Sequence, residues 1–253
     1  MSRTHPFKWW NTIAFIAVIV VNILASTLPI GGRSTAAVSN MYPTLLTPAG
    51  YAFSIWSVIY LLLACFVVYQ ATSAGQTKTS VQSNGFFFIL SCIFNMIWIF
   101  LWQYVYVELC VIVIILYLLS LAVVYVRTRT PQPTLGEMWF VKLPFSLNLG
   151  WVSVATIINI TVALEKNEWN GWGLSDTTWA VIVLFIGTVL AIMVSFPYRD
   201  SIYPLVFVWA YVAIAIAIKH PDNENVRLAA FILAAIILVY SLWLFFARNR
   251  DRD

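Results

Sequence analysis

Charged residues are scarce in this chain of 253 residues, since they make up 9% of it, whereas a typical soluble domain has roughly 25%. Hydrophobic residues make up 62%. A water-soluble fold cannot hide that much apolar surface, so the sequence predicts a multi-pass integral membrane protein with the lipid bilayer as its main partner. We expect it in the cell membrane. The formal net charge of +4 comes from basic residues in loops and at the C-terminus, which predicts a membrane orientation rather than binding to nucleic acid.

Histidine and cysteine are also rare, which disfavours several kinds of site. His5 and His220 lie in polar flanks far apart, and Cys65, Cys92 and Cys110 are scattered through apolar runs. This spacing predicts neither a disulfide framework nor a metal site. The sequence has no Gly-x-Ser-x-Gly motif and no glycine-rich phosphate loop, so we expect no conventional catalytic site and no cofactor. None of the ten acidic residues lies in the middle of an apolar run, which disfavours a proton-coupled carrier.

Apolar runs long enough to cross a bilayer, about 20 residues each, are abundant. Polar or turn-forming segments separate eight of them, which predicts an all-α membrane protein with eight spans. The runs cover about 10–30, 50–72, 85–104, 107–126, 138–163, 179–197, 202–218 and 227–247. The first run could also be a cleaved signal peptide. A retained helix is favoured because the run exceeds the roughly 7–15 apolar residues of such a peptide.

The distribution of basic residues predicts how these spans are oriented. With the N-terminus inside, the predicted cytoplasmic segments hold ten Lys and Arg residues and the opposite segments hold four. Cytoplasmic loops of membrane proteins carry an excess of Lys and Arg. We therefore expect both termini in the cytoplasm and an even number of spans.

Aromatic and amide side chains are the most informative features of the predicted spans. Of the 12 tryptophans, those near predicted span ends are typical of the aromatic belt at a membrane interface. Others repeat with helical spacing, so that each set shares one helix face. These sets are Phe53, Trp56 and Tyr60; Asn95, Trp98 and Trp102; and Trp151, Ala155 and Ile158, with Asn159 alongside.

The asparagines in these runs leave two interpretations open. An Asn that faces lipid is costly, so Asn95, Asn148 and Asn159 should face the bundle interior or a cavity. They could hydrogen-bond between helices, for about 0.6–2 kcal/mol each. Alternatively, they could be the few polar groups of a pocket with aromatic walls.

Four separate segments carry recognisable motifs. Tyr42, Leu45 and Pro48 follow the pattern Tyr-x-x-Leu-x-x-Pro. Tyr51-Ala52-Phe53 and Trp56-Ser57-Val58-Ile59-Tyr60 stand for Trp-x-Phe and Trp-x-x-Leu-Tyr. Asn95-Met96-Ile97-Trp98 matches Asn-x-x-Trp, and Trp151–Asn159 (WVSVATIIN) is similar to Trp-Val-x-Phe-Ala-x-x-Leu-Asn. Together these motifs resemble the TspO/MBR family, the tryptophan-rich sensory proteins that include the mitochondrial translocator protein. The chain departs from the family pattern in having Thr47-Pro48 for Pro-Pro and one residue fewer between Phe53 and Trp56.

The resemblance covers about residues 1–164 and implies a five-helix membrane domain there. Residues 165–253 would add three transmembrane helices and a basic C-terminal tail, as in a long, divergent branch. The family's pocket is closed by the loop between the first two helices. Its members often dimerise, which makes a homodimer possible here, although the three extra spans could occupy or replace the dimer surface. By resemblance, the ligand-binding residues are Trp98, Trp151, Ala155 and Ile158, with Asn95 and Asn159, then Tyr51, Phe53 and Trp56 near the mouth, and Tyr42 and Pro48 in the lid.

Members of the family bind porphyrins and, in some cases, sterols. The resemblance therefore implies a receptor or binding protein for a flat hydrophobic small molecule, above all a tetrapyrrole, with a sensory or stress-related role. Aromatic faces suit such a ligand because stacking and apolar burial need few hydrogen bonds. Three alternatives stay open: a passive transporter of an amphipathic molecule, a light-dependent porphyrin-degrading activity, and a structural protein whose Trp and Asn residues only pack helices. The enzyme is the least favoured, because no acid–base site is visible.

Overall fold

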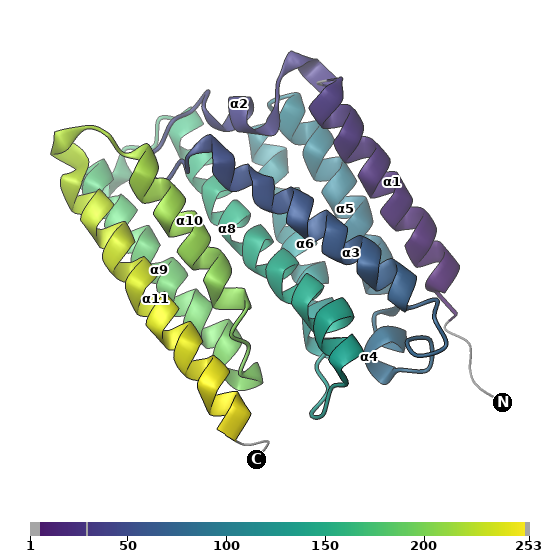
Figure 1. Ribbon diagram of the computed structural model, residues 1–253. Helices are drawn as coiled ribbons and strands as arrows, with labels where there is room; N and C mark the ends of the chain where they lie inside the picture. The colour runs from purple at the N-terminus through teal and green to yellow at the C-terminus, as the bar shows by residue number, and fades with distance from the viewer. Residues whose placement is uncertain (1–5, 29, 251–253) are drawn as a thin grey trace. The chain divides into compact units, whose positions relative to one another are not determined.

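The computed structural model describes residues 6–28 and 30–250, and every regular element in that part of the chain is a helix (Figure 1). Seven segments within the described residues are long and apolar enough to cross a membrane. This confirms the prediction of an all-α, multi-pass membrane protein. The long helices agree with the predicted spans to within a few residues: α1 (Lys8–Thr27), α3 (Ile55–Tyr69), α5 (Gly85–Gln103), α6 (Val107–Arg127), α8 (Leu143–Lys166), α9 (Asp176–Ser195) and α11 (Glu224–Arg250).

The eighth predicted span is the apolar helix α10 (Tyr203–Ala217). It has 15 residues and so is about 22 Å long, whereas the hydrocarbon core of a bilayer is about 30 Å thick. Nine of those residues are buried, and the helix packs against both α9 and α11. Protein rather than lipid therefore surrounds much of α10, which relaxes the length that a lipid-facing helix needs.

Local sequence explains how the longest helical segment begins. Thr134 accepts a hydrogen bond from the Glu137 N–H, and the Glu137 side chain reaches back to the Thr134 N–H, which is a capping box at the start of α7 (Leu135–Glu137). A wide π turn, η3 (Met138–Lys142), follows and leads into α8. Pro144, the second residue of α8, has no N–H to donate, so a change of hydrogen-bond pattern next to it is expected.

Shorter helices and turns connect the long ones. The short α-helices are α2 (Thr35–Ser39) and α4 (Thr79–Gln82). The 3-10 turns are η1 (Ile30–Gly32), η2 (Gly50–Ser54), η4 (Gly171–Gly173), η5 (Phe196–Tyr198) and η6 (Pro221–Asn223).

The helices group into two compact units. Unit 1 consists of Met1–Val38 with Ile55–Val152, and unit 2 of Ser39–Ser54 with Ser153–Asp253. In unit 1, α1 packs against α3 and α5, and α5 against α6. In unit 2, α9, α10 and α11 pack on one another, and η2 lies against α10. Helix α8 contributes residues to both units, and the predicted division into 1–164 and 165–253 stays a prediction.

Buried aromatic rings form part of the core of unit 1. Phe66, Phe88 and Phe145 come from α3, α5 and α8, and each is at most 1% exposed. Their ring centroids lie 4.9 to 5.9 Å apart with edge-on geometry, which aromatic pairs prefer. This packing holds together the three helices that carry the site described next.

Candidate functional site

Three tryptophans from three helices meet inside unit 1, and we call them the Trp56 cluster. The ring of Trp56 (α3) lies 6.1 Å from that of Trp98 (α5) and 6.3 Å, edge-on, from that of Trp151 (α8). Trp98 and Trp151 are 3% and 1% exposed, whereas Trp56 is half-buried. The structure thus brings together three residues predicted from separate motifs, and Trp56 is the most exposed of them.

Trp56 also connects this cluster to a polar network. Its ring stacks on that of Tyr60, one turn further along α3, with centroids 5.4 Å apart. The Tyr60 hydroxyl donates to Asn22 Oδ1 at 3.0 Å and accepts from Asn95 Nδ2 at 3.3 Å. Asn22 Nδ2 in turn donates to Asn95 Oδ1 at 2.9 Å. Helices α1, α3 and α5 are therefore joined by a closed triangle of side-chain hydrogen bonds beside an aromatic wall.

The other two predicted asparagines lie outside this triangle. Asn148 Oδ1 accepts from the Tyr117 hydroxyl of α6 at 3.2 Å, which links two helices of unit 1. Asn159 Nδ2 donates to the Ala155 carbonyl of its own helix at 2.8 Å. Asn148 thus forms a bond between helices, and the bond of Asn159 stays within α8.

The loop between the first two spans lies against α10 in unit 2. The Ala49 N–H donates to the Ala213 carbonyl at 3.0 Å, and Trp209 Nε1 donates to the Ala52 carbonyl at 3.1 Å. The ring of Tyr51 meets that of Trp209 edge-on at 5.3 Å. The segment that the family resemblance makes a lid is thus bonded to a helix from the C-terminal part of the chain.

A small apolar pocket lies in unit 2, with a cavity volume of about 20 Å³. Leu46 of the loop, Ile158 of α8 and Leu184 of α9 face it. Its remaining lining residues are Val154, Ile157, Val183, Phe207, Tyr211 and Ile214. Only apolar atoms line it, and it is far too small for a tetrapyrrole.

The remaining predicted residues lie around these features. Ala155 is buried on α8, and Phe53 is half-buried in η2. Tyr42 is half-buried and Pro48 is buried, and both flank Leu46 in the loop. Of the predicted set, Ile158 faces the apolar pocket, and Trp56, Asn95, Trp98 and Trp151 belong to the aromatic and polar groups of unit 1.

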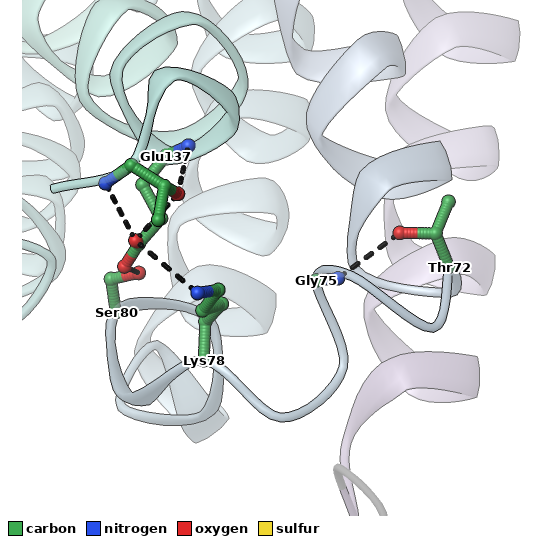
Figure 2. Close-up of polar contacts among 6 residues, drawn as sticks. Thr72, Gly75, Lys78, Ser80 and Glu137 are labelled. Atoms are coloured by element: carbon green, nitrogen blue, oxygen red, sulfur yellow. Dashed lines mark hydrogen bonds and ion pairs between the residues drawn. The ribbon is translucent and has the colours of Figure 1, made fainter.

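Glu137 is a buried carboxylate, 5% exposed, whose contacts are structural (Figure 2). It accepts hydrogen bonds from the hydroxyls of Ser80 at 2.6 Å and of Thr134 at 2.8 Å. Lys78 Nζ lies 3.9 Å from its Oε2. These contacts attach the loop after α3, which Thr72 and Gly75 tighten with a 3.1 Å hydrogen bond, to the start of α7. Glu137 therefore holds these two segments of unit 1 together.

Some residues of the site were not predicted from the sequence. Asn22 is one of two asparagines in the first span, with Asn11, and an amide within an apolar run was a readable signal for a partner. The pocket walls from α9 and α10 are ordinary apolar residues without a motif. In residues 6–28 and 30–250, no three His, Cys, Asp or Glu side chains lie close enough together to hold a metal ion.

The fold and these groups define a polytopic helical membrane protein with an aromatic interior. Comparison with family models gives a match to the TSPO-like protein family over residues 8–243. The chain therefore belongs to the TSPO-like family. The match continues through α9 and α10 to Trp243 in α11, well beyond the residues 1–164 over which the motifs were recognised. No curated protein and no solved structure matches the chain significantly.

Proposed function

We propose that this protein is a membrane receptor for a flat hydrophobic ligand, a tetrapyrrole above all, which binds at the Trp56 cluster. The observation that carries the proposal is the meeting of three tryptophans from α3, α5 and α8 beside a hydrogen-bonded triangle. Stacking on Trp56 would supply most of the binding energy through apolar burial. The triangle offers a donor or acceptor to a polar group of the ligand.

Family membership supports a binding or sensory role in general, and the ligand is our proposal. Because Trp98 and Trp151 are almost fully buried, a ligand that stacks on Trp56 must displace side chains around it. We expect the three tryptophan rings to move apart when the ligand binds. The affinity should therefore depend on the size and shape of each ring.

The test is a titration with protoporphyrin IX, followed by the porphyrin's own absorbance so that removal of a tryptophan does not alter the signal. We expect Trp56→Phe and Trp151→Phe to weaken saturable binding several-fold relative to wild type. Trp243→Phe is the matched control, because Trp243 lies in α11 and is 54% exposed. Equal affinity in all four proteins, or no saturation, would exclude the Trp56 cluster as a tetrapyrrole site.

Two further measurements separate a receptor from the alternatives. A passive transporter would carry the porphyrin across proteoliposomes faster than across empty liposomes. A light-dependent degrading activity would bleach the porphyrin spectrum under illumination, and Trp151→Phe would slow it. A protein that acts only as a receptor would bind the porphyrin but would neither carry it across the membrane nor bleach it.

A further inference from the structure

A second group of aromatic rings lies where α8 is joined to α9. Trp169 and Trp172 in the connecting loop and Trp179 in the first turn of α9 contact one another, and we call them the loop cluster. Their ring centroids are 5.0 to 5.8 Å apart, with planes inclined by 56° to 77°. Aromatic pairs in such inclined arrangements stabilise one another beyond the burial of their area.

The backbone of this loop holds an unusual conformation. Gly171 and Gly173 have φ values of +62° and +81°, and Trp172 between them has φ +50°. Bulky residues rarely adopt a positive φ, so local bonds must hold Trp172 there. Asn170 Oδ1 accepts from the Trp172 N–H at 3.1 Å, and Trp179 Nε1 donates to the Gly171 carbonyl at 2.6 Å.

The consequence of this conformation is that one large aromatic side chain points outward. Trp172 is 78% exposed, whereas Trp169 and Trp179 are half-buried beneath it. The loop joins two segments that are each long enough to span a membrane, Leu135–Lys166 and Asp176–Tyr198. A loop in that place lies at the edge of the bilayer, where Trp is favoured because its ring is apolar and its N–H is polar.

We propose that the loop cluster is a membrane-interface anchor that binds the headgroup and glycerol region of the lipid bilayer, with Trp172 as the inserted side chain. Glu168 and Asp176, both exposed, flank the cluster. Because charged side chains are costly in hydrocarbon, they prevent deeper insertion of the loop. The anchor fixes the depth of the C-terminal end of α8, the helix that also carries Trp151 and Ile158. This role is independent of which ligand the Trp56 cluster takes.

The test places Trp172 by ¹⁹F NMR of protein labelled with 5-fluorotryptophan in phosphatidylcholine nanodiscs. Trp172→Phe, or Trp172→Tyr if Phe disturbs the loop, assigns its resonance by the line that disappears. Two paramagnetic reagents are then compared: a lipid with a nitroxide on its headgroup, and a water-soluble gadolinium chelate. We expect the headgroup nitroxide to broaden the Trp172 line several-fold more than the chelate does. Trp102, which is 1% exposed, is the control that neither reagent should broaden strongly.

A second variant tests whether the loop conformation creates the anchor. A Cβ on Gly171 would lie 3.2 Å from the Trp179 ring, at a φ that Ala rarely adopts. We therefore expect Gly171→Ala to open the cluster and make the Trp172 line more sensitive to the chelate. Stronger broadening of wild-type Trp172 by the chelate would place it in water and overturn the proposal. Protection from both reagents would mean that protein covers it, for example a second copy of the chain, and would overturn the proposal equally.

Discussion

Different kinds of contact join the helices within each of the two units. In unit 1, carboxamides bond between helices: Asn22 with Asn95, Asn11 Nδ2 with Gln70 at 3.1 Å, and Asn148 with Tyr117. In unit 2, hydroxyls make the bonds that join α9 to α10, α8 to α10 and α9 to α11. The Tyr211 hydroxyl donates to the Leu184 carbonyl at 2.6 Å, Ser153 and Tyr203 share a bond at 2.9 Å, and Ser195 and Tyr240 share one at 3.1 Å.

Small residues take the place of amides at the helix contacts of unit 2. Gly187 of α9 and Ala210 and Ala213 of α10 are buried, as are Ala230 and Ala234 of α11. Without large side chains, helix backbones approach closely, which is a common way to associate helices in lipid. Amide pairs fix which residues face each other, whereas close packing of small residues fixes how near two helices come. The two units should therefore respond differently to polar and to steric changes.

The largest effect is expected from enlarging Gly187. A Cβ there would overlap the Tyr211 hydroxyl, which is already bonded to Leu184. We expect Gly187→Leu to lower the free energy of unfolding by about 3 kcal/mol, because overpacking forces α9 and α10 apart. Gly50→Leu is the matched control, since Gly50 is exposed and a Cβ there meets nothing within 4 Å. Unfolding in mixed SDS–detergent micelles measures both, and similar losses would contradict close packing as the means by which unit 2 associates.

An intermediate effect is expected in unit 1 from Asn95→Leu, which removes two sides of the hydrogen-bonded triangle. We expect a loss of about 1–2 kcal/mol in the free energy of unfolding, because only the Asn22–Tyr60 side of the triangle then remains. Asn225→Leu, at an exposed position in the first turn of α11, should change little.

A double-mutant cycle sharpens this prediction. Asn22→Leu with Asn95→Leu should cost less than the sum of the single changes, because both remove the same bond. Additive losses would show that the amide pair contributes no coupling, and unit 1 would then not differ from unit 2 in this respect.

Sequence patterns predicted the helices well but not their partners. Apolar runs located α5 and α6 almost to the residue, because the need to satisfy backbone hydrogen bonds in lipid forces such runs into helices. Helical spacing also placed Trp98 with Asn95 on one face. It could not pair Asn95 with Asn22, since the two lie 73 residues apart and periodicity says nothing about which helix is the neighbour.

Two further features of the structure could not be predicted from sequence patterns, each for a different reason. Part of the wall of the apolar pocket comes from α9 and α10, whose residues are apolar on most sides, so that no face of these two helices stands out in the sequence. The loop Ser39–Ser54 lies in sequence between α1 and α3 of unit 1 but groups with unit 2. That grouping depends on tertiary bonds to α10, which no local signal in the loop records.

The smallest expected effect tests those bonds through Trp209→Phe. Phe keeps an aromatic ring next to Tyr51 but removes the hydrogen bond to the Ala52 carbonyl, for a loss of about 1 kcal/mol. Because the loop is also held by the Ala49 N–H on Ala213, the loss should show as several-fold faster hydrogen exchange at Ala49 rather than as global unfolding. Exchange in the segment around Asn95 should stay unchanged, and Trp243→Phe should leave both segments as in wild type. If Ala49 exchanges at the wild-type rate in Trp209→Phe, the loop is held by the bond from Ala49 to Ala213 and by apolar contacts. The bond from Trp209 would then play no part in joining this loop to unit 2.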